Sequence, residues 1–207
     1  MLIKRFLPDN IPKVQVLRFQ NMYALCVMTR VMKGLCDYYL NDDYESVTAS
    51  INALCYYVTF DMLFCEKIIY FHHFLCGTLG YLYFNNSEAT HASKDFCALI
   101  LTTEVSTFFL TLRVMLEDVK HLNIYTKRAY YAVSAFFSIT FFYFRFYVYI
   151  NAMRSDQYAL LLSTISYFNR GVLKFGLNGL LLLNIYWGSL ILKSIYRTIC
   201  PKNATNE

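Results

Sequence analysis

Glycine and proline are scarce in this sequence, at only 7 and 3 of its 207 residues. Because these residues mark turns and loops, their scarcity excludes a loop-rich or all-β chain and favours long helices. Charged residues make up only 16%, whereas a soluble domain has about 25%. Hydrophobic residues account for 57%, and the mean hydropathy is +0.35. These values predict a helical membrane bundle, and the length requires no second domain.

The apolar residues form runs long enough to cross a bilayer, which takes about 20 mostly apolar residues. We expect about six spans, within Phe19–Leu40, Val47–Phe64, Ile68–Phe84, Phe96–Leu116, Ala129–Ile150 and Val172–Leu192. The short gap at residues 65–67 predicts a tight antiparallel hairpin of the second and third helices. Tyr158–Phe168 is too short to cross, so it is a re-entrant or interfacial piece or the beginning of the last helix. The predicted fold is all-α, a multi-pass transmembrane bundle over residues 19–197, with tails at 1–18 and 198–207.

Basic residues are distributed unevenly between the two predicted sides of the membrane. Eleven Lys and Arg fall in segments on the side of the N-terminus, and two fall on the other side. Since basic loops stay cytoplasmic, both termini are expected in the cytoplasm. The net charge of +5 therefore reflects topology, and no basic-aromatic stripe indicates nucleic-acid binding. The basic N-terminal stretch lacks the apolar core of a cleavable signal.

Motifs of soluble enzymes are absent: there is no G-x-G-x-x-G, phosphate loop, G-x-S-x-G or H-E-x-x-H. The 7 cysteines form no C-x-x-C pair, and six lie in or beside apolar runs, which is typical of small buried side chains. Zinc would need a third protein ligand beside an adjacent histidine pair. We therefore predict no metal site and no bound cofactor.

Two adjacent histidines, His72 and His73, interrupt the apolar run FHHFLCG. An ionisable residue at membrane depth is a functional-site hypothesis by default. The two side chains point about 100° apart on a helix, so they can border one cavity but not face one narrow groove. A neutral imidazole can act as a general base, whereas a pair held by hydrogen bonds for packing would explain the same residues.

Asp61 is a carboxylate inside the apolar run Val47–Phe64, eleven positions before His72. On a continuous helix the two would share a face, but the turn at residues 65–67 should break that register. A buried carboxylate needs a partner, so an ion pair or hydrogen bond that fixes the second helix is the alternative to a catalytic role.

A second polar group begins at Glu104, followed by Thr107 and Thr111 in one stripe along a helix. Arg145 is flanked by aromatic residues and should pair with a carboxylate or face a water-filled cavity.

In order and spacing, these residues resemble the TLC-domain family of ceramide synthases and translocon-associated membrane proteins. The similarity extends from Asn21 to Tyr196, and Asn21 and Gly34 bracket the first helix as the family's Asn and Gly do. YYVTFD resembles the family motif that ends in an aspartate, and FHHFLCG resembles its central histidine pair. The segments TEVSTFFLTLR, FFYFR and LNIYWGSLILK contain the remaining matches, Glu104, Ser106, Thr107, Arg113, Arg145, Asn184 and Trp187.

The resemblance implies an endoplasmic-reticulum or related endomembrane protein that acts in lipid homeostasis through an intramembrane lipid cavity. Membrane lipids would be its partners, and both a membrane-protein partner and a homo-oligomer stay open. The candidate catalytic residues are His72, His73, Asp61 and Glu104, and the family arrangement would place these four around one cavity with Arg145 beside it. The residues assigned to the cavity or its ion pairs are Ser106, Thr107, Thr111, Arg113, Arg145, Asn184 and Trp187.

The resemblance also suggests an alternative, transfer of an acyl chain from acyl-CoA to a sphingoid base or another lipid amine. His72 or His73 would deprotonate the amine, and Asp61 or Glu104 would orient that histidine. Ceramide synthases carry a His-Asp pair and a further Asp after their histidine pair, where this chain reads TTEVS. The family often has a histidine in the first helix, where this chain has Thr29 next to Arg30. The chain therefore resembles the TLC-domain-containing branch more than the synthases.

Overall fold

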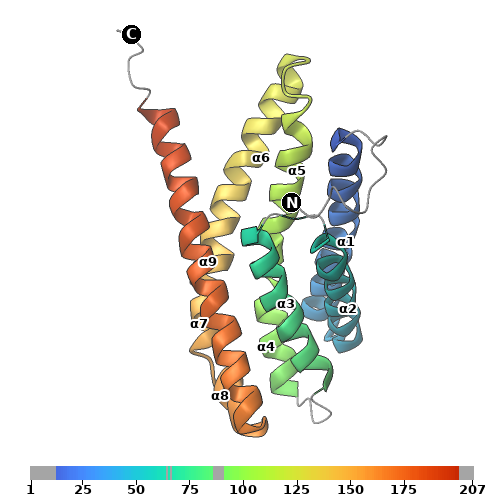
Figure 1. The fold of residues 1–207 in the computed structure, drawn as a ribbon, viewed down its shortest axis with the longest axis vertical. Coiled ribbons are helices and arrows are strands. Elements are labelled where there is room, and N and C mark those ends of the chain that lie inside the picture. The colour runs from blue at the N-terminus through green and yellow to red at the C-terminus, as the bar shows by residue number, and fades with distance from the viewer. Residues whose placement is uncertain (1–12, 64, 66, 86–90, 201–207) are drawn as a thin grey trace.

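The computed structural model describes residues 13–63, 65, 67–85 and 91–200, and these residues are almost entirely helical, with no strand among them (Figure 1). The elements are α1 Lys13–Asn41, α2 Tyr44–Asp61, α3 Lys67–Asn85, α4 His91–Leu101, α5 Glu104–Glu117, α6 Ile124–Phe142, the π-helix η2 Tyr143–Val148, α7 Tyr149–Met153, α8 Asp156–Thr164 and α9 Tyr167–Ile199. The all-helical prediction is confirmed. Residues 1–12 and 201–207 of the predicted tails lie outside the described residues.

The longer helices line up as rods that close a ring. α4 and α5 follow one another as one rod, and α6, η2 and α7 form another. Going around the ring, α1 packs against α2, α2 against α3, α3 against α9, α9 against α6 and η2, α6 against α5, and α5 against α1. The short helix α8 packs against α4. The α2–α3 turn lies well short of the upper tips of α5, α6 and α9 (Figure 1).

Three rods in the described part of the chain are long and apolar enough to cross a membrane: Lys94–Glu117, Ile124–Met153 and Tyr167–Ile199. The protein is therefore a helical bundle with three candidate spans, and the predicted six are not confirmed. The other three rods are less apolar because α1 carries charges such as Arg30 and Lys33, and α2 and α3 carry interior polar residues such as Asp61 and His73.

Two rods that we predicted as single helices are interrupted. Between α4 and α5, the hydroxyls of Thr102 and Thr103 donate to the carbonyls of Leu99 and Ile100, at 2.5 and 2.8 Å. Hydroxyl bonds of this kind compete with the backbone ladder and bend helices. The other interruption is η2, Tyr143–Val148, and π-helical turns are rare and frequent at functional sites. Both interruptions adjoin the polar cluster described below.

Two connections between helices have clear local causes. The α1–α2 turn ends at Asp43, which caps α2 by accepting the backbone N–H groups of Glu45 and Ser46. The hydrogen bonds from Ser46, its hydroxyl first, lower the pKa of the Asp43 carboxyl. The segment Tyr158–Phe168 contains most of α8 and the beginning of α9, separated where Ser166 caps the new helix.

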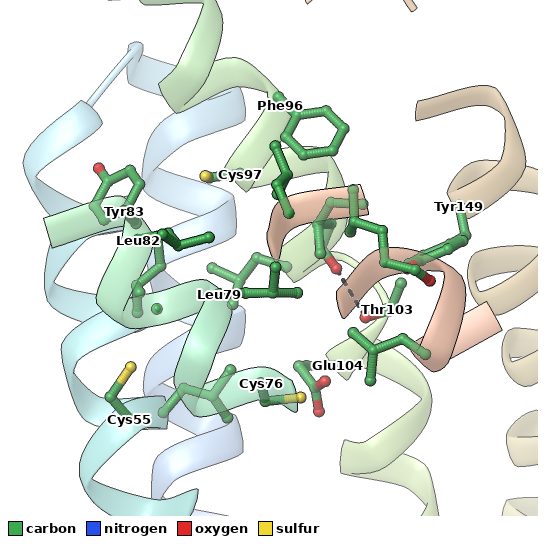
Figure 2. Close-up of a pocket in the computed structure, with 18 of the residues that line it drawn as sticks. Cys55, Cys76, Leu79, Leu82, Tyr83, Phe96, Cys97, Thr103, Glu104 and Tyr149 are labelled. Carbon is green, nitrogen blue, oxygen red and sulfur yellow. Dashed lines mark hydrogen bonds between the residues drawn. The ribbon is translucent and has the colours of Figure 1, made fainter. Parts of the chain in front are cut away.

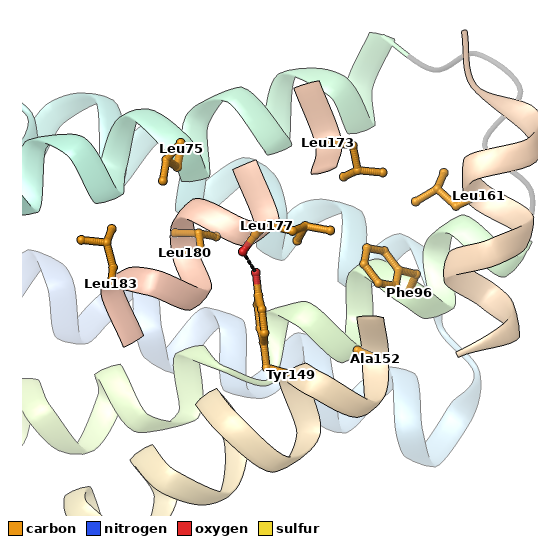
Figure 3. Packing of buried hydrophobic residues seen from close by; sticks show 9 residues of the cluster. All are labelled: Leu75, Phe96, Tyr149, Ala152, Leu161, Leu173, Leu177, Leu180 and Leu183. Atoms are coloured by element: carbon orange, nitrogen blue, oxygen red, sulfur yellow. Dashed lines mark hydrogen bonds between the residues drawn. The ribbon is translucent and has the colours of Figure 1, made fainter. Parts of the chain in front are cut away.

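Two hydrophobic clusters stabilise the ring. One fills the space between α3, α4, α7, α8 and α9, and the other joins α1, α2, α4 and α5. In the first cluster, the Tyr149 hydroxyl donates to the Leu177 carbonyl at 2.7 Å, so the polar end of this fully buried ring is satisfied (Figure 3). This bond fixes α7 against α9.

The α1–α2 contact depends on a glycine. A Cβ added at Gly34 would clash with the Ser50 side chain and would lie 2.6 Å from the Ser46 carbonyl oxygen. The Ser50 hydroxyl already donates to that carbonyl, at 2.7 Å. The two helices therefore approach one another closely only because residue 34 has no side chain.

We predict that Gly34→Ala destabilises the protein by about 1–3 kcal/mol through overpacking of α1 against α2. Gly77→Ala is the matched control, because a Cβ at Gly77 meets nothing within 4 Å. The measurement is thermal unfolding of both variants in the same detergent. Equal stability of the two variants would contradict the close α1–α2 contact.

Candidate functional site

Arg145, from η2, is the centre of a buried hydrogen-bonded cluster. Its Nε donates to the Ser106 hydroxyl at 2.8 Å, Nη1 to the Asn184 Oδ1 at 3.2 Å, and Nη2 to the Thr107 hydroxyl at 2.7 Å. Asn184 returns a bond from its Nδ2 to the Arg145 carbonyl at 3.3 Å. The guanidinium thus connects α5, η2 and α9, and its Cζ atom lies 5.7 Å from the Phe141 ring centre.

Glu104 supplies the counter-charge. Its Oε1 lies 3.7 Å from the Arg145 Nη2, and both side chains are more than nine-tenths buried. A buried charge is costly unless it is paired and hydrogen-bonded, and Arg145 meets both conditions. Glu104 is the first residue of α5, directly after the Thr102–Thr103 break. The break therefore positions the carboxylate at an N-terminal helix end, which favours negative charge.

His73 is paired with Asp61 across the α2–α3 hairpin. Its Nε2 lies 2.8 Å from the Asp61 Oδ2, and both residues are buried. Gln20 of α1 donates its Nε2 to the other carboxylate oxygen at 3.2 Å. Since a carboxylate only accepts, we assign the proton to Nε2, and the buried Nδ1 has no partner among the described residues. The Tyr57 ring packs edge-on to His73 at 5.8 Å.

His72 points in another direction and contacts different residues. Its Nε2 lies 3.6 Å from the Cys76 sulfur one turn along α3. The Trp187 ring of α9 packs edge-on to the imidazole, with the ring centres 5.2 Å apart. His72 therefore borders α9, whereas the neighbouring His73 borders α2.

A cavity of about 130 Å³ lies inside the ring. Its walls come from α2, α3, α4, α5, η2, α7, α8 and α9, and most of the lining side chains are aliphatic or aromatic (Figure 2). The Cys76 sulfur and the Glu104 carboxylate lie at one end, and Phe96 and Tyr83 lie at the other (Figure 2). Asn184 and Arg145 also line the cavity. The space is therefore amphipathic, with one polar end and long apolar walls.

The family model of the TLC domain (TRAM_LAG1_CLN8) matches residues 16–193. The chain belongs to the TLC-domain family. No curated protein and no solved structure gives a significant match. The match covers all the rods of the ring apart from the ends of α1 and α9, so it includes every residue of the polar cluster and the histidine pair.

The structure divides the TLC-domain residues that we expected in one cavity. His72 and Glu104 line the cavity, and Arg145 lies beside Glu104. The expectation that Asp61 and His73 also line it is wrong: they form a separate buried pair toward α1 and α2. The reason is the angle of about 100° between successive side chains on a helix, which turns one histidine inward and the other sideways.

The other predicted TLC-domain residues fall into two groups. Ser106, Thr107 and Asn184 contact the Arg145 guanidinium directly. In the second group, Trp187 packs on His72, Thr111 donates to the Thr107 carbonyl at 2.9 Å, and Arg113 donates to the Tyr130 hydroxyl at 3.0 Å. Of the two groups, only Asn184 lines the cavity. Arg113 therefore fastens α5 to α6. Arg30 is half-buried on α1 and is not among the cavity residues.

Sequence reasoning missed three residues of the site. Gln20 orients Asp61, Cys76 contacts His72, and Tyr149 lines the cavity between α7 and α9. Cys76 could have been found, because it follows His72 at the i+4 spacing that places two side chains together on a helix. Gln20 gave no signal, since its contact with Asp61 depends on how α1 packs on α2.

We predict that Arg145→Leu destabilises the protein by about 3–5 kcal/mol, because it leaves the Glu104 carboxylate buried without its cation. The double change with Glu104→Gln should recover part of this loss. The double change with Asp61→Asn should be additive, since Asp61 is paired with His73. Thermal stability in detergent measures each single and double variant, and strict additivity with Glu104→Gln would reject the pair.

Proposed function

We propose that the protein acts in lipid homeostasis by holding part of a membrane lipid in the cavity. The observation that supports this is the division of the cavity into apolar walls and a polar end with Glu104, Arg145 and Asn184. A lipid has the same division, between its chain and its headgroup. The aliphatic chain would lie along Leu79, Phe96 and their neighbours, and the polar group would reach the cluster.

We also propose that the six rods of the ring are six spans of an endoplasmic-reticulum or related endomembrane, with both termini cytoplasmic. α2 and α3 have 18 and 19 residues, about 27–29 Å of helix, which approaches a hydrocarbon core of about 30 Å. Two of their ionisable residues, Asp61 and His73, are buried in the bundle. The uneven distribution of Lys and Arg supports the orientation.

The alternative is an acyltransferase that moves an acyl chain from acyl-CoA to a sphingoid base or other lipid amine. The position of His72 favours it, because a cavity-lining imidazole can accept a proton from an amine held at the polar end. In this reading Glu104 and Arg145 would bind the polar groups of the substrate. His73 and Asp61 would position α3 from behind without touching the substrate.

We predict that His72→Gln changes the cellular lipid profile and leaves expression and detergent stability near normal. The imidazole lines the cavity, and its loss removes no ion pair. The experiment compares lipidomes of a deletion strain rescued with wild type or His72→Gln, and with His121→Gln as the control because His121 is exposed. A lipidome equal to wild type would reject a role for the cavity histidine in lipid handling.

A second assay separates the two functions. Purified protein is incubated with acyl-CoA and a sphingoid base, and the N-acylated product is measured by mass spectrometry. Product that forms with wild type and not with His72→Gln supports the acyltransferase. Lipid that copurifies with wild type, without product formation, supports binding alone.

The topology predicts that Asn203, in the acceptor pattern Asn203-Ala204-Thr205, is never N-glycosylated, because it should lie in the cytoplasm. Asn203 lies outside the described residues. An acceptor sequence inserted after Asp42, in the α1–α2 turn, should be glycosylated and is the positive control. Glycosidase digestion followed by a gel shift reads both sites, and a glycan on Asn203 would overturn the proposed orientation.

A further inference from the structure

Three different metal-ligating side chains meet at the α2–α3 hairpin. The ligand atoms of Asp61, Cys65 and His73 all lie within 4.8 Å of one another. Asp61 ends α2, Cys65 lies in the turn, and His73 lies on the second turn of α3. Sequence analysis did not group them, because the spacing of the three residues matches no metal-binding motif.

The set of donors is the kind that zinc selects. Zinc is bound in proteins by cysteine sulfur, histidine nitrogen and carboxylate oxygen. Its ligand bonds of about 2.0–2.3 Å in a tetrahedron place the ligand atoms about 3–4 Å apart. The Asp61–His73 separation of 2.8 Å would have to widen by a fraction of an ångström, and the Cys65 sulfur already lies within 4.8 Å of both of these ligand atoms.

The surroundings of the three side chains also suit a bound cation. Gln20 donates to the Asp61 oxygen that does not contact His73, which fixes the orientation of the carboxylate. Outer contacts of this kind orient metal ligands and are important for affinity. Asp61 and His73 are buried, and Cys65 is partly exposed, so an ion can enter from the side of the turn. In Figure 1 this turn lies below the upper tips of α5, α6 and α9.

We propose that Asp61, Cys65 and His73 form a zinc site that fastens the α2–α3 hairpin. The ligands are the Asp61 carboxylate, the Cys65 thiolate and the His73 Nε2, and the fourth position is open to water. Zinc takes the place of the proton between His73 and Asp61, the neutral imidazole then carries its proton on Nδ1, and the Cys65 thiol releases its proton to solvent. The site is separate from the cavity, since none of its three residues lines it.

The experiment measures metal bound to the purified full-length protein in detergent. The protein is stripped with a chelator, dialysed against Zn²⁺ and analysed for zinc per chain, and Co²⁺ is used in parallel as a spectroscopic probe. We expect one zinc ion per chain. We also expect a near-ultraviolet sulfur-to-cobalt absorption band, because such a band requires a thiolate ligand.

The deciding variant is Cys65→Ser, which is nearly isosteric and lies at a partly exposed position. It should abolish the sulfur-to-cobalt band and weaken zinc binding at least about 10-fold, the lower limit for loss of even an outer contact. His72→Gln and Cys26→Ser are the matched controls, a neighbouring histidine and an exposed cysteine outside the cluster, and should bind zinc as wild type does.

Two results would overturn the site. One is wild-type protein that retains no zinc after dialysis, and the other is Cys65→Ser protein that binds zinc with unchanged affinity. Asp61→Asn also removes the buried carboxylate that pairs with His73, which could lower stability without any metal. The thermal stability of this variant is therefore measured with and without zinc. A zinc-dependent rise in stability that is present in wild type and absent in Asp61→Asn supports the site. The lipid proposal is unaffected by either outcome, because it depends on the cavity.

Discussion

The buried guanidinium of Arg145 is the constraint on which the other contacts of the ring depend. An unpaired charge at membrane depth costs at least about 2.5–3.5 kcal/mol. Arg145 avoids this cost through Glu104, Ser106 and Thr107 on α5 and Asn184 on α9. Because a guanidinium presents its donors in a rigid plane, these contacts fix the relative height and rotation of three rods. The chain does not join α5 directly to α9. The contacts of Arg145 with both helices therefore hold them in position relative to one another.

The same cluster explains why two rods are irregular. The break at Thr102 and Thr103 begins α5 at Glu104, and the π-helical turn rotates Arg145 toward it. If either segment were a regular α-helix, the Arg145 and Glu104 side chains would point in different directions around their helices. Departures from ideal helix geometry are expected where function or a buried network constrains the backbone. Two residues at the polar end of the cavity, Glu104 and Arg145, thus directly follow or lie in the irregular segments, and the apolar walls come mainly from regular helix.

The helices, the position of His72 beside a cavity and the proximity of Arg145 to a carboxylate could be predicted from the sequence, because each depends on local patterns. Apolar run length predicts helices, and an aromatic-flanked arginine indicates a buried partner. The choice of Glu104 over Asp61 could not be predicted, since it depends on how the rods pack. The same limit applies to the break after Leu101 and to Gln20. The number of membrane spans is the clearest example of this limit. Interior polar side chains lower the hydropathy of α2 and α3 whether or not these helices cross a membrane.

The two adjacent histidines have different roles in the structure. His73 on α3 is paired with Asp61 on α2, on the side of α3 away from the cavity. His72 is the preceding residue and lines the cavity. Since both rings project from one turn of α3, the pair behind the helix fixes the rotation that presents His72 to the cavity. Trp187 holds the imidazole from the α9 side, so a rotation of α3 would separate His72 from both Trp187 and the cavity. The hairpin contact is thus a positioning element for the cavity histidine, and the integrity of Asp61 matters to the cavity although Asp61 does not touch it.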